Sequence, residues 1–372
     1  MASPADCRES PDNSRTQHKG SEKFHYREDM DDARDLEFLE ARVEGEEPRL
    51  RPLYRVMQIV QEAVHASYVK FDSKAVSMHW CYKWDSALAV FFGGASVFFA
   101  VAEATKLWDG KIDTLLWELL MVFCALFFIA VGIAVGFKQR WILRRTQAER
   151  LRLLKFRSLT NPDLWCDGER HDKAVTALKF EVDCISTMEY SNSKSWAREG
   201  VHPSVVAPPC KDRCEVAMDE FLLHYVPKRL NVQMEYLKSH WDQVELWGIG
   251  TATLVTFMYW GSFVLVFCHM LHAKLVELGY KIDPSYGSVL AFSALAIPVF
   301  AAGIRTYRAA HEFERNALRH KATYDSLRWL AEQFELADDR EKKFEIVGFA
   351  ELVLEADCRE FIRLVSEAEW YG

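Results

Sequence analysis

Apolar residues gather in four long blocks, 86–102, 119–137, 246–273 and 284–304, and none of these blocks contains an Asp, Glu, Lys or Arg. A bilayer core of about 30 Å needs about 20 helical residues to cross it. The second and fourth blocks fit this length and the first barely reaches it. The third exceeds it and is expected to tilt or to emerge at one end. Four such blocks favour a membrane protein over a soluble fold with buried core helices. The pattern predicts an all-α, polytopic membrane protein with four transmembrane helices in two hairpins and helical cytoplasmic extensions.

Basic residues predict how the hairpins are oriented. The link inside the first hairpin carries only Lys106 and Lys111, and the link inside the second carries Lys274 and Lys281. The segments outside the hairpins hold the basic clusters. Because cytoplasmic loops are enriched in Lys and Arg, both hairpins should point away from the cytoplasm and both termini should be cytoplasmic. The first partner of the chain is then the lipid bilayer.

The second apolar block runs directly into a basic segment. We expect this helix to leave the membrane without a break, so that its basic turn lies at the cytoplasmic headgroups and attracts anionic lipid. The predicted anchor residues are Lys138, Arg140, Arg144 and Arg145. In the same way, the stretch after the fourth block, 305–335, is predicted to continue the fourth span.

One plan occurs twice along the chain: a cytoplasmic helix, a hairpin and a second cytoplasmic helix. A His-Trp pair precedes each hairpin, as His79-Trp80 and His240-Trp241. In the linker between the copies, "KAVTALKFEVDCISTM" has a helical pattern, whereas the sequence from "SNSKSW" onward is typical of a loop. The predicted boundaries are 1–50 for a disordered, charged N-terminal segment, 51–158 for the first hairpin with its cytoplasmic helices, 159–215 for a cytoplasmic linker, 216–335 for the second hairpin with its cytoplasmic helices, and 336–372 for a C-terminal amphipathic helix.

The net charge of −8 arises mostly in the first fifty residues, which also lack a secretory signal. The nine cysteines are scattered and predict reduced thiols. Cys166, His171, Cys210 and Cys214 lack the paired spacing of structural zinc sites, so we expect no metal. No phosphate-binding glycine loop, nucleophile elbow or zinc-protease motif occurs. We therefore expect neither an enzyme nor a cofactor, and no nucleic-acid partner.

Two groups of span residues are candidate sites. The small residues Gly93, Gly94, Gly132 and Gly136 are predicted to let helices pack closely, within one chain or between chains. The carboxylates Glu103, Asp113 and Glu118 lie toward the outer hairpin. Repeated around an oligomer they would form the mouth of a cation pore, or they are ordinary interfacial carboxylates.

Two further features of the spans bear on function. His269 and His272 lie near the outer end of the third block, either as functional intramembrane groups or already at the interface. Pro298 is expected to interrupt the fourth helix.

The segment after the first hairpin resembles the bacterial SLATT families, small two-span membrane domains found with nucleotide-generating or nucleotide-sensing modules in antiphage and other conflict systems. The residues that carry the resemblance are Trp141, Arg144, Arg145, Ala148, Glu149, Arg150 and Leu151. The tail "HEFERNALRH", "YDSLRWLAEQF" and "AELVLEADCREFIRLVSEAEW" is similar to the C-termini of larger proteins of this layout, so the resemblance covers about 52–372. It implies a pore-forming or membrane-disrupting effector in a bacterial inner membrane. Larger relatives often carry a nucleotide-binding SLOG domain, which the first fifty residues are too short to form, so any nucleotide-sensing or nucleotide-generating component would be a separate protein.

Large aromatic residues in the spans bear on which function to expect. With Phe91, Phe92, Phe98, Phe99, Phe127 and Phe128, four helices should pack shut, so conduction would require a homo-oligomer. The favoured hypothesis is a multimeric pore or membrane-perturbing effector. A non-conducting scaffold that recruits a cytoplasmic partner is the alternative. A transporter ranks third, because no span carries a charge near the middle of the membrane.

Overall fold

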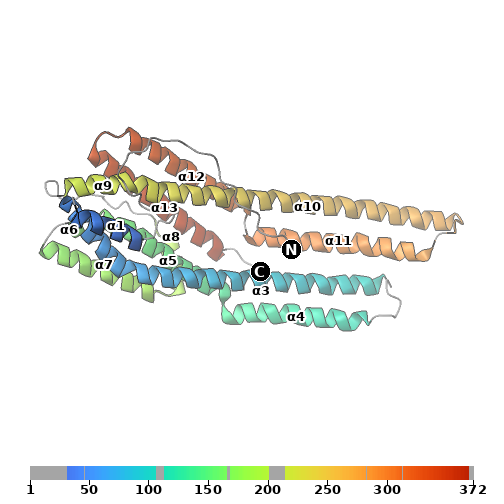
Figure 1. Ribbon diagram of the computed structural model, residues 1–372. Helices are drawn as coiled ribbons and strands as arrows, with labels where there is room; N and C mark the ends of the chain where they lie inside the picture. The colour runs from blue at the N-terminus through green and yellow to red at the C-terminus, as the bar shows by residue number, and fades with distance from the viewer. Residues whose placement is uncertain are drawn as a thin grey trace.

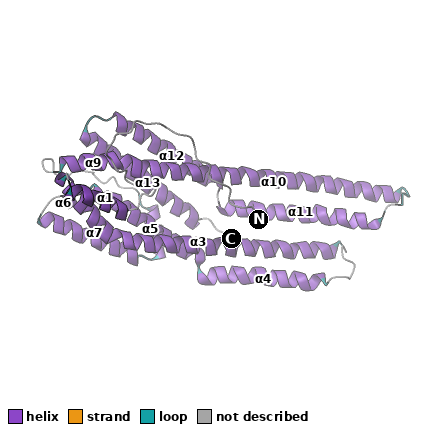
Figure 2. Cartoon of the chain, viewed as in Figure 1, coloured by secondary structure: helices purple, strands orange, loops and turns teal. Residues whose placement is uncertain are grey.

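The computed structural model describes residues 32–45, 47–105, 113–165, 168–200, 214–281, 283–311 and 313–367, and these contain helices and no strand (Figure 2). The elements before and within the first copy are α1 (Asp32–Glu44), η1 (Pro48–Leu50), α2 (Arg51–Val60), η2 (Gln61–His65), α3 (Ala66–Ala104), α4 (Thr114–Val135) and α5 (Phe137–Leu159). The linker holds α6 (Pro162–Trp165), α7 (Glu169–Thr187) and α8 (Tyr190–Arg198). The remaining elements are α9 (Glu215–Tyr225), η3 (Val226–Asn231), α10 (Val232–Glu277), α11 (Pro284–His311), α12 (Phe313–Leu336) and α13 (Arg340–Glu367).

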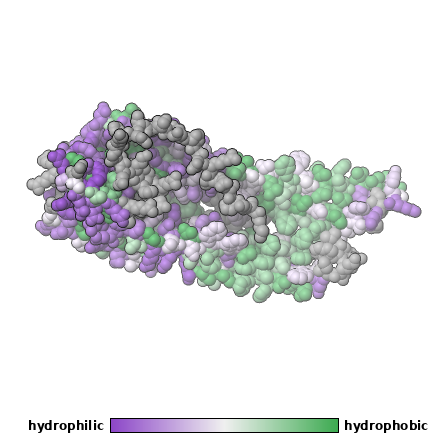
Figure 3. All heavy atoms as spheres, viewed as in Figure 1, coloured by the Kyte–Doolittle hydropathy of each residue, from purple (hydrophilic) through white to green (hydrophobic). Residues whose placement is uncertain are grey.

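The molecule is elongated, with a helical bundle at one end and four apolar helical segments at the other (Figure 1). The 39-residue α3 and the 46-residue α10 run through both parts. Four helical segments are long and apolar enough to cross a membrane. Hydrophobic residues cover most of the apolar end, and polar residues lie at its far tip and over much of the bundle (Figure 3). The prediction of an all-helical chain with four helices of spanning length is therefore confirmed.

The four apolar segments lie in an open row. α4 packs on α3, α3 packs on α11, and α11 packs on α10 (Figure 1). α4 and α10 therefore stand at the two ends of the row and each has one apolar neighbour among the described segments. Their outer faces expose large side chains, such as Phe123 on α4 and Phe257 on α10, at 68% and 70% exposure. The row does not close into a four-helix bundle.

The expected unbroken passage from the second apolar block into the basic segment is wrong. α4 ends at Val135 and α5 begins at Phe137, and between them Gly136 adopts a left-handed conformation with φ of 65°. Its N–H donates to the Gly132 carbonyl at 3.0 Å, which closes the last turn of α4. A residue with a side chain is strained at such a φ, so glycine is what permits this break. The sequence pattern has continuous helical periodicity here and does not reveal the turn.

The expected interruption of the fourth helix at Pro298 is also wrong, because α11 continues through this residue. Proline has no N–H, so the carbonyl four residues earlier, that of Ala294, loses its normal partner. Ser262 on α10 replaces it: the buried Ser262 hydroxyl donates to the Ala294 carbonyl at 2.7 Å. A side chain of the neighbouring helix thus satisfies the polar group that the proline frees.

Two polar regions are more ordered than the sequence indicates. The prediction of disorder for residues 1–50 is wrong from Asp32 onward, since α1 packs on α2 and the Leu39 side chain is fully buried. The segment from Tyr190 to Arg198, expected to be a loop, is α8. Its Trp196 is buried against the bundle, where α13 covers it. In both cases few apolar residues are involved, and packing on other helices stabilises the segment: α2 for α1, and α13 for α8.

The two copies of the plan share their helix order. A helix and a π-helical turn lead into a long helix in each copy: α2, η2 and α3 in the first, α9, η3 and α10 in the second. Each long helix then packs on the next apolar helix and on the first helix after it: α3 on α4 and α5, α10 on α11 and α12. α13 lies outside the repeat and contacts α5, α8, α9 and α12. The C-terminal helix therefore connects elements of both copies.

Candidate functional site

A cavity of about 450 Å³ lies where the bundle meets the apolar segments, between α3, α5, α10, α12 and α13. Three of its lining residues mark this level along the chain. Lys83 lies three residues before the first apolar block, Lys138 directly after the second, and Val244 two residues before the third. Both copies of the repeat contribute side chains, so the cavity sits at their interface.

The His-Trp pairs noted in the sequence contribute equivalent histidines to this cavity. His79 comes from α3 and His240 from α10. The His79 ring stacks on Trp141 of α5 with centroids 4.5 Å apart, and the His240 ring lies 4.0 Å from that of Tyr236. His240 also faces His320 of α12 at 6.3 Å. Aromatic faces thus form part of both walls.

Cations outnumber carboxylates in the lining. Arg145 pairs with Asp72 and with Glu149, and Arg152 pairs with the same Glu149 at 3.5 Å. Desolvation is the largest influence on Arg145 and opposes its charge, but Glu149, Tyr236 and Asp72 together outweigh it and raise the guanidinium pKa. One carboxylate therefore serves two guanidiniums on this wall. The cationic and anionic groups that line the cavity are Lys83, Lys138, Arg145, Arg152, Arg229 and Arg319 against Glu149 and Asp357. Two carboxylates outside the lining, Glu351 and Asp72, pair with Arg229 and Arg145 and offset part of this positive charge.

Burial and the neighbouring cations affect the histidines. Burial lowers the pKa of His240, and the nearby cations Arg145 and Lys83 lower it further, although a hydrogen bond to the Tyr236 carbonyl opposes both. Burial and the Arg319 charge lower the pKa of His320 to about 3. His320 is therefore neutral at physiological pH.

Arg319 and His320 line the cavity and each also holds a donor atom that is buried away from it. Arg319 Nη1 pairs with Asp357 at 2.7 Å, and its Nη2 lies 3.3 Å from His320 Nε2. Because a guanidinium can only donate, Nε2 is the acceptor and the neutral ring carries its proton on Nδ1. Within the described part of the chain, neither His320 Nδ1 nor Arg319 Nε has a hydrogen-bond partner, and both atoms are buried. Two buried donors beside the cavity thus lack an acceptor among the described residues.

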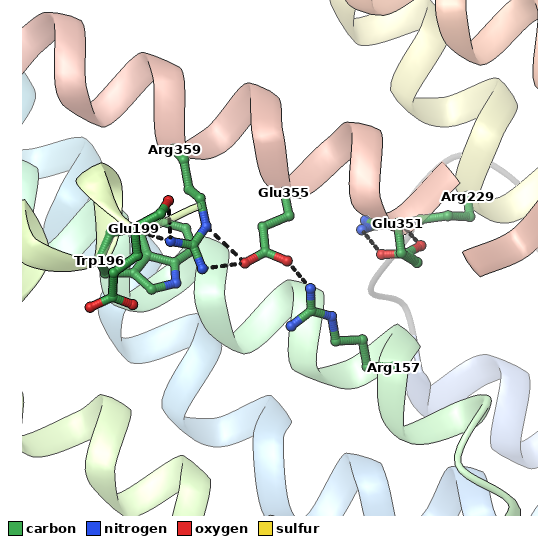
Figure 4. A network of polar contacts seen from close by, with 7 residues as sticks. All are labelled: Arg157, Trp196, Glu199, Arg229, Glu351, Glu355 and Arg359. Atoms are coloured by element: carbon green, nitrogen blue, oxygen red, sulfur yellow. Dashed lines mark hydrogen bonds and ion pairs between the residues drawn. The ribbon is translucent and has the colours of Figure 1, made fainter. Parts of the chain in front are cut away.

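A buried ionic network joins α13 to η3, the turn that leads into α10 (Figure 4). Arg229 of η3, which is 2% exposed, donates from Nε and Nη2 to the two carboxylate oxygens of Glu351, each at 2.9 Å. The Tyr225 hydroxyl donates to Glu351 Oε1 at 2.8 Å, and the Arg229 guanidinium lies 4.0 Å from the Phe156 ring centroid. Burial, together with the Glu351 charge, raises the Tyr225 pKa, so the hydroxyl keeps its proton and remains a donor.

A second part of the network joins α13 to α5 and α8 (Figure 4). Glu355, at 3% exposure, pairs with Arg157 at the end of α5 and accepts from Arg359 Nε at 2.8 Å. Arg359 Nη1 donates to the backbone carbonyls of Trp196 and Glu199, and its guanidinium lies 4.4 Å from the Trp196 ring centroid. α13 is thus fixed to α5 and α8 as well as to η3.

The four residues of the predicted basic anchor lie in different surroundings. Arg140 is exposed and Lys138 lines the cavity. Arg144 donates to Gln147 and lies over the Phe71 ring of α3, and Arg145 pairs with Asp72. Two of the four residues therefore hold α5 against α3 inside the bundle. Their charge was noted in the sequence, but not these partners.

The predicted small-residue sites differ in their surroundings. A side-chain carbon at Gly94 would lie 3.7 Å from the Phe300 ring of α11, so Gly94 is at a helix contact, whereas Gly93 has open space. Gly132 is half-buried and, with Gly136, closes α4 as described above. A side-chain carbon at Gly303 of α11 would lie 3.8 Å from the Val90 side chain of α3, so Gly303 belongs to the same α3–α11 contact. Gly303 was not among the predicted small-residue sites.

The predicted pore-mouth carboxylates are placed at the far end of the apolar row. Asp113 caps α4, its Oδ1 accepting the Leu116 N–H at 3.1 Å, which accounts for an acidic residue at this position. Glu103 is exposed in the last turn of α3 and Glu118 is half-buried in α4. Lys106 and Lys111 lie outside the described residues.

The remaining histidine and cysteine candidates differ in their contacts, and His269 Nδ1 and His272 Nε2 are buried without a hydrogen-bond partner in the described part of the chain. His272 packs on Gly287 of α11, where a side-chain carbon would lie 3.1 Å from the ring, and His269 is half-buried on the same helix. His171 Nδ1 lies 3.1 Å from the Leu164 carbonyl and Cys214 Sγ lies 3.9 Å from the Trp165 carbonyl. Cys166 and Cys210 lie outside the described residues. Burial and the nearby Glu149 raise the pKa of Cys358, so this thiol stays protonated and is a poor nucleophile.

The cavity itself was missed by sequence reasoning, although the sequence contained a signal for it. The duplicated His-Trp pairs were noted, and His79 and His240 line the same space. The sequence does not show that α12 and α13 pack over this cavity. Comparison with known proteins adds no assignment, since no protein-family model, curated protein or solved structure matches the chain.

Proposed function

We propose that this chain is an integral membrane protein in which two two-span hairpins join an intracellular helical bundle, and that it acts as a multimeric pore or membrane-perturbing effector. The open row of apolar segments carries the proposal. Four helices in a row enclose no path for water, and α4 and α10 keep their outer faces exposed. Copies that associate through these faces would complete a closed assembly, and the chain alone would conduct nothing.

Control by the bundle is supported by the continuity of the helices. α3 and α10 each run from the bundle into the apolar zone without interruption. A change in the cavity or at α13 would therefore be passed to the apolar segments as a movement of a rigid helix. In a conflict system of the kind that the SLATT resemblance implies, the signal would come from a separate nucleotide-sensing or nucleotide-generating protein.

Transport and scaffolding are less well supported. Transporters hold substrate at broken helices near the middle of the membrane. Here α11 continues through Pro298, and the described hydroxyls in the apolar zone, such as Ser96, Ser262 and Thr256, bond to backbone carbonyls. A non-conducting scaffold would act through the bundle, and its apolar faces would meet lipid alone.

The experiment is the membrane potential of a bacterial host after induction, read with a voltage-sensitive dye. The intact chain should depolarise the membrane, and the chain lacking the second hairpin should not. A second comparison uses the purified chain in dye-loaded vesicles, where leakage should rise more steeply than in proportion to protein density. If the inserted protein causes neither depolarisation nor leakage at any density, a pore that opens without a signal is excluded and the scaffold is favoured.

A further inference from the structure

α12 carries apolar residues on two sides. On its inner side, residues such as Leu327 and Leu330 are buried in the bundle, where α12 packs on α10 and α13. On the opposite side, exposed residues recur at i, i+4, i+7, i+11, i+14 and i+18, which is the spacing of a single helix face. We call these residues the outer stripe: Leu318, Ala322, Asp325, Trp329, Glu332 and Leu336. Leu318, Trp329 and Leu336 are 68%, 58% and 73% exposed, so the outer stripe leaves large apolar side chains uncovered.

Lipid does not account for the outer stripe. α12 follows α11 on the bundle side and packs along α10, away from the apolar row (Figure 1). Helices that lie on a membrane surface carry Lys and Arg on their polar face, which anionic lipid attracts. Anionic lipid would instead repel Asp325 and Glu332. A protein surface is therefore the cover that fits an apolar stripe interspersed with carboxylates.

The half of the outer stripe from Asp325 to Leu336 has a net negative charge. Its one cation along α12, Arg328, pairs with Glu332 at 3.1 Å. In the described part of the chain, the exposed Asp325 and Glu335 take part in no ion pair. Two carboxylates thus remain on α12 after the pairing is taken into account.

The residues that follow α12 do not cancel this charge. The turn after the helix adds Asp338 and Asp339, and Arg340 pairs with Asp219 of α9 at 2.8 Å. The charges at the start of α13 balance one another, with Lys342 and Lys343 against Glu341 and Glu345. The surroundings of the outer stripe therefore favour a positively charged partner.

A second copy of this chain does not suit the outer stripe in the proposed membrane placement. Copies in one membrane share the same orientation, so a symmetric contact would bring equal levels of α12 together. Each carboxylate would then lie near its own counterpart, and like charges at an interface are costly. The occupant that fits is a different protein.

From these observations we propose that the outer stripe binds a basic amphipathic helix of a separate soluble protein. Two helices pack through apolar residues at this spacing, and charged residues at the flanks select the partner. Trp329 and Leu336 are the apolar anchors, since tryptophan is enriched among the residues that dominate binding energy. Asp325 and Glu335 pair with Lys or Arg of the bound helix.

The outer stripe also gives a bound protein access to the spans, because α12 packs on α10 and α10 runs into the apolar zone. That the bound protein delivers the activating signal rests on the proposed function. The docking itself requires no conduction.

The test uses two designed helical peptides and the purified full-length chain in phosphatidylcholine nanodiscs. Both peptides have Leu at positions a and d of each heptad, and one has Lys and the other Glu at positions e and g. Binding is followed by fluorescence anisotropy of the labelled peptide, and empty nanodiscs give the contribution of lipid. We expect the Lys peptide to bind the native chain at least about tenfold more tightly than the Glu peptide.

Matched variants assign this binding to the outer stripe. Trp329→Ala should weaken binding of the Lys peptide about tenfold or more, the effect of removing a dominant anchor. Phe180→Ala, which truncates an aromatic residue on α7 that is 69% exposed, should leave binding unchanged. The double variant Asp325→Lys with Glu335→Lys changes two exposed residues, so it should fold. It should reverse the preference, so that the Glu peptide binds more tightly than the Lys peptide.

Three results would overturn the proposal. One is that the native chain binds the Lys peptide no more tightly than the Glu peptide. Another is that Trp329→Ala binds as tightly as Phe180→Ala, or that the charge-reversed variant keeps the native preference. The third is that Trp329→Ala lowers the molecular mass of the solubilised chain without peptide, since a second copy would then be the occupant. Because peptide binding is measured without a membrane potential, failure of the pore proposal leaves this result unaffected, and the reverse also holds.

Discussion

The Arg229–Glu351 pair is the most deeply buried ionic contact between α13 and η3, the turn that leads into α10. Two charges in a buried site are costly to desolvate, and this cost is offset only when every donor and acceptor is paired. Here the two guanidinium contacts, the Tyr225 hydroxyl and the Phe156 ring provide those partners. The pair therefore fixes the position of α13 more than it adds net stability.

A double-mutant cycle tests this account. Arg229→Met alone leaves the Glu351 carboxylate buried and unpaired, and should cost about 3–5 kcal/mol. Adding Glu351→Leu removes the unpaired charge and should recover a large part of that loss. The measurement is the thermal midpoint of the purified chain in detergent. Additive losses in the double variant would show that each side chain stabilises the fold independently of the other.

His320 predicts a pH dependence with a definite sign. Burial and the Arg319 charge lower its pKa to about 3 in the folded chain, below the ordinary value of 6.5. As the pH falls through 6.5, the unfolded chain takes up a proton that the folded chain does not, so stability falls with pH between 6.5 and 3. The groups facing this ring are Arg319 and His240.

The comparison of the native chain with His320→Asn isolates this contribution. Other titrating groups act in both proteins, so the difference between their thermal midpoints reports the imidazole. As the pH is lowered from 7.5 to 5, the thermal midpoint of the native chain should fall relative to that of His320→Asn. An unchanged difference across this range would mean that His320 titrates normally in the folded protein.

At the scale of the elements, the Ser262 hydroxyl and Pro298 form one structural unit across α10 and α11. The proline removes the N–H that would bond to the Ala294 carbonyl, and the serine supplies the replacement. Ser262→Ala should therefore destabilise the chain, by about 0.6–2 kcal/mol for an interhelical hydrogen bond in an apolar zone.

The proline variant provides the matched control. Pro298→Ala restores the backbone N–H, so the serine becomes redundant and Ser262→Ala should cost little in that background. Thermal midpoints of the four proteins complete the cycle. If Ser262→Ala costs the same with alanine at position 298 as with proline, the hydroxyl does not compensate for the proline.

Much of the element order could be predicted from the sequence, because long apolar blocks and the helical periodicity of "KAVTALKFEVDCISTM" are local signals. The errors lie where local signals fail. Gly136 stops α4 through a left-handed backbone that no periodicity reports, and Pro298 is tolerated because a different helix supplies a hydroxyl. α8 exists because α13 covers Trp196. The candidate site depends on the same kind of distant contact, since its residues come from five α-helices and the π-helical turn η3.

At the scale of the whole molecule, the open row and the bundle have separate structural roles. The apolar row has two free edges, α4 and α10, while the bundle joins both copies through α13. Because each long helix belongs to both parts, a structural change in the bundle has a direct mechanical route into the apolar zone. The functional proposal therefore depends on how the row is oriented relative to the membrane.

The native cysteines provide a test of that orientation. Cys81 on α3 and Cys184 on α7 are exposed on the bundle side, and Cys124 and Cys268 lie within the apolar segments. If the bundle is cytoplasmic, a membrane-impermeant maleimide should leave the native chain unlabelled in intact spheroplasts and should label it in inverted vesicles. The variant Tyr280→Cys adds a thiol at an exposed position between α10 and α11, and should be labelled in spheroplasts.

The two proteins differ by one residue, so the native chain is the control for reagent leakage and the variant is the control for reagent activity. Labelling of Cys184 in intact spheroplasts would place the bundle outside and reverse the predicted topology. Labelling of position 280 from both sides would mean that the second hairpin inserts in two orientations. Labelling of position 280 from outside alone, with Cys184 protected, would orient the cavity toward the cytoplasm, where a signal from a soluble partner could reach it.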